Sequence, residues 1–153
     1  MDSEWEKLVK RYVWNDERTP YFTQVAKLSR RQAHYELFGY AFFTGVVFAV
    51  LAFASLSTGL PHGDTPWVSL VAFAVCCAAI LLGATHDHWA ALCCALGPLA
   101  ALIYFALYGF HPGLETGDKV LIVALVLGWL VYGRRVVAVA RAWPDLPGPA
   151  EPD

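Results

Sequence analysis

Charged residues are scarce in this chain and are nearly absent from its long apolar stretches. Only 16% of the 153 residues are Asp, Glu, Lys or Arg, compared with roughly 25% in an ordinary soluble domain. The stretches Leu37–Leu56, Trp67–Ala84 and Trp89–Phe110 contain none of these four residue types, and a fourth apolar stretch runs from Val120 to Tyr132. An uncharged run of about 18 residues is long enough to cross a bilayer as a helix. The composition therefore argues against a water-soluble fold.

The apolar stretches also lack the alternation of apolar and polar residues that a membrane barrel strand needs. Because lipid cannot hydrogen-bond exposed peptide groups, helices remain as the way to cross the membrane. We therefore expect an all-α integral membrane protein, built as an antiparallel four-transmembrane-helix bundle. The expected spans are about 37–56, 67–84, 89–110 and 118–142. A cytoplasmic amphipathic and basic helical segment (1–36) precedes them, and a Pro-rich cytoplasmic tail (143–153) follows.

Lys and Arg are missing from the polar loop 57–66 and, apart from Lys119, from the loop 111–119. Ten of the eleven Lys and Arg residues lie before the first apolar stretch or after the fourth. Short segments rich in Lys and Arg stay on the cytoplasmic side of a membrane. We therefore expect a multi-pass protein of the bacterial inner membrane, with both termini and the short turn 85–88 in the cytoplasm.

The segment before the first span contains two patterns that predict helix starts. Ser3-Glu4-Trp5-Glu6 and Ser29-Arg30-Arg31-Gln32 both fit a capping box, so we expect the first spanning helix to begin near Arg30. This segment is also too long for a secretory signal peptide, and we expect the first span to be retained. The apolar face of the N-terminal helix is formed by Trp5, Leu8, Val9, Tyr12 and Val13. This face suits either the headgroup layer of a bilayer or packing against a protein surface.

Cysteine is missing from every loop, and the four cysteines form the adjacent pairs Cys76–Cys77 and Cys93–Cys94 inside apolar stretches. Thiol or metal chemistry is one interpretation. The other is helix packing, because small side chains let helices approach closely in lipid. Each span contains such a stripe of small residues: Gly45, Ala49 and Ala52; Ser69, Ala72, Cys76, Ala79 and Gly83; Ala90, Cys94, Gly97 and Ala101; Ala124 and Gly128. We favour packing.

The two loops expected outside the cytoplasm contain histidines and carboxylates. His62 and Asp64 lie in the first of these loops, and His111 and Glu115 lie in the last, followed by Asp118. His and carboxylate groups together are ligands for Zn²⁺ or Cu²⁺, which makes these loop residues a candidate metal site. Their neighbours are Pro and Gly, however, and such sequences also build tight turns without a metal.

The cytoplasmic end offers a second group of polar residues. His86, Asp87 and His88 form the turn between the second and third spans, where they are candidates for a proton relay or a pH sensor. An ordinary polar turn is the other interpretation, and the one we favour. His34 and Arg135 are expected nearby.

Arg135 is the remaining candidate, because a helical projection places it on the same face as Gly128 and Ala142. It either lines a solute path inside the bundle or extends to the headgroups together with Arg134. We favour the second alternative, in which the two arginines are equivalent.

Motifs for catalysis are absent from the sequence. The chain contains no HExxH, no phosphate-binding Gly-rich loop and no carboxylate inside the four apolar stretches, which argues against proton-coupled cation export. The net charge of −2 gives no reason to expect a nucleic-acid partner. We expect a non-enzymatic accessory, assembly or scaffold subunit without a cofactor. Its partners would be the lipid bilayer and another membrane protein or a second copy. The alternatives are a transporter or channel for a small solute, with Arg135 in the path, and a metal-handling protein that uses the outer loops.

Overall fold

The computed structural model describes residues 23–57 and 65–148, and these residues form helices and connecting turns without a strand. In chain order the elements are η1 (Val25–Lys27), α2 (Arg30–Leu56), α3 (Pro66–Thr85), α4 (His88–Tyr108), α5 (Thr116–Ala142) and η2 (Trp143–Asp145). The four long helices are each long and apolar enough to cross a membrane. The predicted N-terminal amphipathic helix, the Ser3 capping box, His62 and Asp64 lie outside the described residues.

The predicted capping box before the first span is confirmed. The backbone N–H of Gln32 donates to Ser29 Oγ over 3.2 Å, and the backbone N–H of Ser29 donates to Gln32 Oε1 over 3.0 Å. These bonds satisfy donors that have no partner within the helix. They also start α2 at Arg30, seven residues before the apolar stretch that begins at Leu37. Glu36 is consequently a residue of the helix itself.

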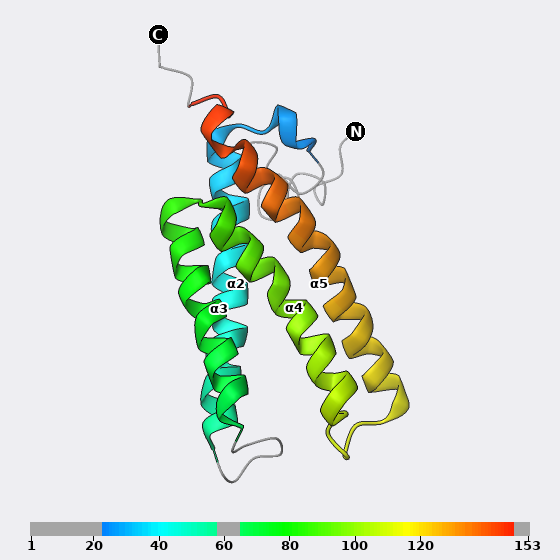
Figure 1. Cartoon of the computed structure of the whole chain (residues 1–153). Helices are drawn as coiled ribbons and strands as arrows, with labels where there is room; N and C mark the ends of the chain where they lie inside the picture. The colour runs from blue at the N-terminus through cyan, green and yellow to red at the C-terminus, as the bar shows by residue number, and fades with distance from the viewer. Residues whose placement is uncertain (1–22, 58–64, 149–153) are drawn as a thin grey trace, which may run out of the picture.

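The start of α2 is tied to the chain that follows α5. The backbone N–H of Arg30 donates to the carbonyl oxygen of Pro147 over 3.1 Å, and its Nη2 donates to the carbonyl oxygen of Pro144 over 3.2 Å. We call this end of the molecule the terminal end, and the opposite one the loop end. Figure 1 shows the light-blue start of α2 and the orange-red end of α5 meeting at the terminal end.

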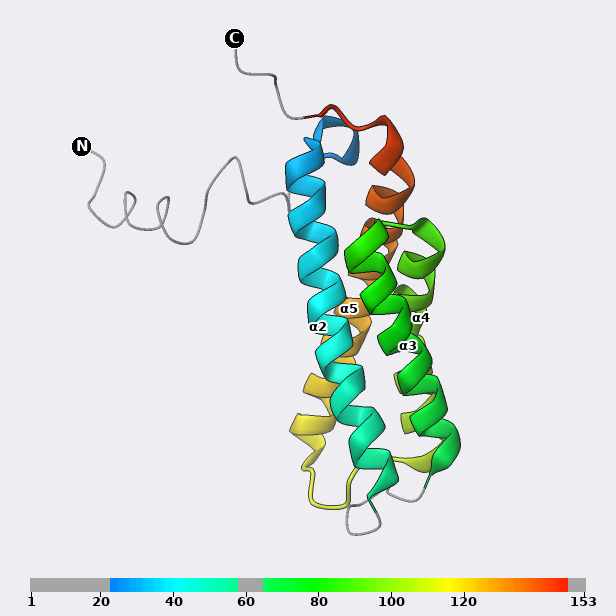
Figure 2. The same cartoon turned by 90° about the vertical axis from the view of Figure 1, so that its left-hand side faces the viewer.

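The four long helices pack closely at the terminal end and diverge toward the loop end. Both views show α2 beside α3 (Figures 1 and 2), and Figure 1 shows that α5 leans away from these two helices at its yellow, N-terminal end. The buried residues of α5 all lie in its C-terminal half: Gly133, Val136, Val139 and Ala140. The main core is therefore at the terminal end, where Leu37 and Leu82 are fully buried beside small residues of all four helices.

Small residues mediate the helix contacts on α2, α3 and α4, as predicted. Ala72 and Ala79 of α3 and Ala90 of α4 are buried. A Cβ added to Gly97 of α4 would lie 2.8 Å from the ring of Phe48, a residue of α2. The prediction is wrong for the pair Ala124 and Gly128 of α5, which is exposed. At Gly128, α5 is separated from α2 by a groove, and a Cβ added to this glycine would meet nothing within 4 Å.

The two cysteine pairs are split between the interior and the exterior. Cys94 is fully buried, and Cys76 is partly buried with its Sγ 3.5 Å from the carbonyl oxygen of Gly45 on α2. Cys77 and Cys93 are exposed on the outer surfaces of their helices. Adjacent residues on a helix point about 100° apart, so only one thiol of each pair can contact the other helices. This placement agrees with a packing role for Cys76 and Cys94.

Candidate functional site

A buried carboxylate lies inside α2, although the apolar pattern of the sequence predicted none in this span. The side chain of Glu36 is 0% exposed, although the residue lies only two turns from the start of the helix. The prediction that the spanning helices contain no carboxylate is therefore wrong for α2, which includes Glu36. The apolar stretch begins at Leu37, but the capping box at Ser29 extends the helix backward past Glu36.

Arg135 of α5 binds both oxygens of this carboxylate. Its Nε donates to Glu36 Oε1 over 2.6 Å, and its Nη2 donates to Glu36 Oε2 over 3.1 Å. The hydroxyl of Tyr132 also donates to Oε1, over 2.9 Å. The third guanidinium nitrogen, Nη1, donates to the backbone carbonyl of Thr23 over 2.8 Å. Arg135 thus links α2, α5 and the residue at which the described chain begins.

The two neighbouring arginines have different surroundings. Arg134 is exposed, whereas the side chain of Arg135 is only 22% exposed and forms the two-pronged contact with Glu36. We expected the two arginines to be equivalent and to extend to the headgroups. This expectation is wrong, because their surroundings differ. A buried carboxylate needs an ionic partner with matching hydrogen bonds, and a guanidinium supplies two parallel donors. The ion pair with Glu36 therefore explains why the side chain of Arg135 points toward the interior.

Two signals in the sequence point to this pair. Glu36 lies six residues after the first residue of α2, and Arg135 lies seven residues before the last residue of α5. With a rise of about 1.5 Å per residue, the two charges therefore lie at nearly the same depth. Glu36, Tyr40 and Thr44 also recur every four residues, which places three polar side chains on one face of an apolar helix.

Tyr40 and Thr44 continue the polar face of α2 deeper into the molecule. The hydroxyl of Tyr40 faces Thr44 and the indole of Trp129, which lies on α5. The hydroxyls of Tyr40 and Thr44 and the Trp129 N–H are buried and form no hydrogen bond of ordinary geometry within the described chain. This second polar layer lies next to the ion pair. The α2–α5 side of α2 therefore carries Glu36 and Thr44, two of the four buried polar or charged residues in the described chain.

A second polar cluster closes the terminal end. The Nδ1 of His34 on α2 lies 2.8 Å from the Nε2 of His86, and the His86 ring stacks on Trp143 with 3.9 Å between ring centres. The guanidinium of Arg30 lies 5.9 Å from the centre of the same Trp143 ring. Burial, followed by the facing His34, lowers the pKa of His86 below its usual value of 6.5. The predicted proximity of His34 to this turn is confirmed. Arg135, also expected nearby, instead donates to Glu36 and Thr23.

The turn that contains His86 has a clear structural role. His86 ends α3 in the left-handed conformation, with φ of 59°, and Asp87 caps α4 by accepting the backbone N–H of Ala90 over 2.9 Å. The adjacent His88 begins α4, with its Nδ1 3.9 Å from Asp87 Oδ1. These contacts are those of a tight helix-to-helix turn. The ring of His86 is the part of this turn that reaches other helices.

The loop residues proposed as metal ligands have structural roles where they are described. The Nδ1 of His111 accepts the backbone N–H of Gly113 over 3.0 Å. Glu115 forms a capping box with Asp118 at the start of α5. His62 and Asp64 lie outside the described residues. In the part of the chain that the structure describes, no three His, Cys, Asp or Glu side chains come together as a metal site.

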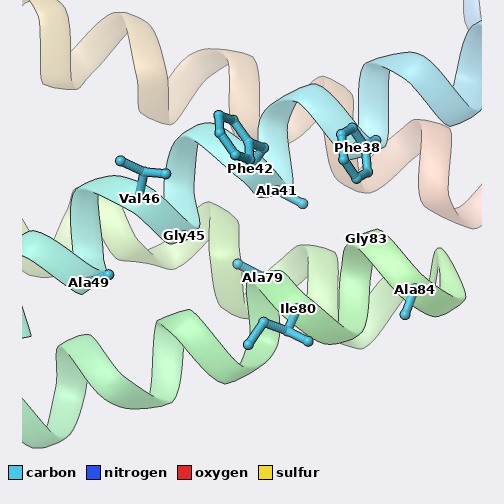
Figure 3. A pocket seen from close by; sticks show the side chains of 10 residues that line it. All are labelled: Phe38, Ala41, Phe42, Gly45, Val46, Ala49, Ala79, Ile80, Gly83 and Ala84. Carbon is cyan, nitrogen blue, oxygen red and sulfur yellow. The ribbon is translucent and has the colours of Figure 1, made fainter.

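An apolar groove of about 540 Å³ lies on the outer surface between α2 and α3. Figure 3 shows Phe38, Phe42 and Val46 on one of its walls and Ile80 on the other, with Gly45 and Gly83 between them. The side chains that line the groove are all apolar, so it has no side-chain donor or acceptor to orient a polar ligand. Its surface suits lipid chains or an apolar helix.

Comparisons of this chain with protein-family models, with curated proteins and with solved structures give no match.

Proposed function

We propose that this chain is a non-enzymatic accessory or scaffold subunit of a membrane complex. Its four long helices would form an antiparallel transmembrane bundle. Its N-terminal segment, held against the bundle by Arg135, would present the docking surface for a partner protein. The proposal rests on the hydrogen bonds that Arg135 forms. All three nitrogens of its guanidinium donate to atoms of the chain itself, namely the carboxylate of Glu36 and the carbonyl of Thr23.

This arrangement favours a scaffold over a solute path. A cation that selects a solute needs donors that the solute can reach, whereas the Arg135–Glu36 pair balances its own charge. The contact with Thr23 adds a tether between the bundle and the segment that precedes it. We infer that the bond from Arg135 to Thr23 anchors the start of the described chain to the bundle, and that a partner protein recognises the segment that precedes Thr23.

The charge distribution supports a cytoplasmic position for this docking surface. Among the described residues, Lys27, Arg30 and Arg31 lie at the start of α2, and Arg134, Arg135 and Arg141 lie near the end of α5. The positive-inside rule assigns such an end to the cytoplasm, here that of a bacterium with the chain in its inner membrane. A reporter that is active only in the cytoplasm, fused after Asp153, should therefore give signal. Signal only from a periplasmic reporter at this position would reverse the orientation.

The docking role is tested by purification of the full-length protein from native membranes in mild detergent. We expect a membrane protein to copurify in a fixed ratio with the wild type and with Arg134→Lys. We expect Arg135→Lys to lose this partner while it still inserts and purifies. Lysine keeps the charge but cannot bind Glu36 and Thr23 together.

The transport alternative predicts a different result. Liposomes that contain the wild-type protein alone would then pass a small solute, and Arg135→Lys would abolish this flux. Equal copurification for Arg134→Lys and Arg135→Lys, together with such a flux, would overturn the scaffold proposal.

A further inference from the structure

Three rings from separate parts of the chain meet at the terminal end, with His86 in contact with the other two. The Nδ1 of His34 lies 2.8 Å from the Nε2 of His86. The His86 ring stacks on Trp143, whose ring centre lies 6.5 Å from that of His34. His34 belongs to α2, His86 to the turn between α3 and α4, and Trp143 to η2. The ring of His86 therefore connects this turn to the first long helix and to the segment that follows the last one.

The contact between the two histidines allows only some of their protonation states. A hydrogen bond between two imidazoles needs one facing nitrogen with a proton and one without. The pair can therefore be neutral or hold one extra proton while the nitrogens stay 2.8 Å apart. A second extra proton would place an N–H on both facing nitrogens. No acceptor would then remain, and two positive charges would face each other.

The surroundings of the pair do not compensate a second positive charge. The face of Trp143 attracts a cation, but the guanidinium of Arg30 already lies 5.9 Å from the centre of this ring. The carboxylate of Asp87 already caps α4 and lies 3.9 Å from the Nδ1 of His88. The other charged residues on the elements around the pair are Arg31 on α2, Arg141 at the end of α5 and Asp145 on η2. Arginines outnumber carboxylates among these groups, which disfavours a further positive charge.

We propose that the His34–His86 pair is a pH-sensitive switch, which is closed near neutral pH and opens in acid by releasing the α3–α4 turn from α2 and η2. Once the turn is released, water surrounds both rings and each can hold its own extra proton, so acid favours the open form. In the closed form, burial and the facing His34 lower the pKa of His86. The closed form is therefore fully favoured above about pH 6.5, the ordinary pKa of histidine, and is lost as pH falls through the lower value.

Other contacts at the terminal end do not depend on the two histidines. The backbone N–H of Arg30 is bound to the carbonyl of Pro147, and Arg135 is bound to Glu36. Leu82, one turn before His86, is fully buried in the main core. Opening is therefore a local movement of the turn, with the bundle still folded. This inference does not depend on whether a partner protein docks on this end.

Distances between two spin labels in the full-length protein test the proposal. In a background in which the four native cysteines are replaced by Ala, Trp89→Cys and Gly148→Cys carry the labels. Both residues are exposed. Trp89 moves with the turn, whereas Gly148 follows Pro147, which is bound to the start of α2. We expect the distance to lengthen by several ångströms between about pH 8 and about pH 5 and to recover when neutral pH is restored.

Substitutions of single histidines separate the pair from other titrating groups. His34→Asn places an amide near the position of Nδ1, and its oxygen accepts a proton from His86 whether or not that ring is charged. This variant should therefore keep the short distance at both pH values. His86→Asn, which tolerates the left-handed backbone at this position, should also lose the response to pH. His88→Asn is the matched control in the same turn, and it should respond as the unsubstituted protein does.

Three results would overturn the proposal. The first is a distance that does not change with pH when all histidines are present. The second is an equal change in the unsubstituted protein and in His34→Asn, and the third is loss of the change in His88→Asn. If His34→Asn does not fold, His86→Asn takes its place, and a pH response equal to that of the unsubstituted protein would then exclude the pair as the switch.

Discussion

Arg135 and Glu36 form a two-pronged ion pair between α5 and α2, with nitrogen-to-oxygen distances of 2.6 and 3.1 Å. The pair joins the last helix to the first at the terminal end, where the core is also densest. The carboxylate is fully buried. The contribution of the pair to protein stability therefore depends on how well the two donors of Arg135 are aligned with the carboxylate oxygens, and not on charge alone.

Arg135→Lys is expected to destabilise the protein, whereas Arg134→Lys is expected to have little effect. Lysine cannot donate along two parallel lines to Glu36 and also reach the carbonyl of Thr23. Each lost hydrogen bond to a charged group costs about 1.5–3 kcal/mol, and we expect at least one such loss. The free energy of unfolding in detergent micelles measures the effect. Equal values for the two variants would contradict the ion pair.

Removal of Glu36 alone should cost more than removal of both partners. Glu36→Leu leaves the guanidinium of Arg135 without its carboxylate, which costs about 3–5 kcal/mol for a buried pair. The 22% exposure of the Arg135 side chain places the expected loss near the lower limit. In Glu36→Leu combined with Arg135→Leu, apolar side chains replace both charges, and most of the lost stability should return. A double variant as unstable as the single one would show that the pair is not coupled.

The change in stability on replacing a glycine of α5 with alanine should depend on the space around that glycine. A Cβ at Gly133 would lie 2.9 Å from the Cβ and 3.2 Å from the Cα of Ala95, so Gly133→Ala should destabilise by about 1–3 kcal/mol through overpacking. At Gly128 on the same helix, a Cβ meets nothing within 4 Å. Gly128→Ala should be neutral or slightly stabilising, because alanine favours the helix. Thermal unfolding of the two variants side by side decides this.

The adjacent cysteines provide a similar comparison. Cys94→Leu should destabilise by about 1–3 kcal/mol, because Cys94 is fully buried between helices. Cys93→Leu should be tolerated, since Cys93 faces outward. Replacement of all four cysteines with Ala should preserve the fold. Loss of a bound metal or of a cellular phenotype in a stable all-Ala variant would overturn the packing interpretation.

His86 should make stability depend on pH. Its pKa is lowered in the folded protein by burial and by the facing His34, so the unfolded chain binds the proton more readily. The stability that His86 contributes is therefore complete above the unfolded pKa of about 6.5 and is lost as pH falls through the lower folded value. Unfolding measured from about pH 8 to about pH 5 should show a steeper loss for the wild type than for His86→Asn. Asparagine tolerates the left-handed backbone at this position.

The apolar stretches and capping residues predicted the helices because these features act locally. Three uncharged runs have the length of spans, a shorter fourth run lies in α5, and Ser29 with Gln32 marks the start of α2 within one turn of chain. The small residues of α3 and α4 were predicted to face other helices, and Ala72, Ala79, Ala90 and Cys94 are buried. Each of these features depends on residues that are close in sequence or on the spacing of residues along one helix. Both can be read from the sequence alone.

Only the tertiary structure decided how the helices meet. Glu36 lies just outside its apolar stretch, and nothing local links it to Arg135, 99 positions away. The divergence of α5 likewise leaves Ala124 and Gly128 exposed, although they repeat the spacing that packs on other helices. Pairing between distant helices depends on depth, rotation and tilt together, and the hydrophobic pattern of a single helix fixes none of these relative to another helix.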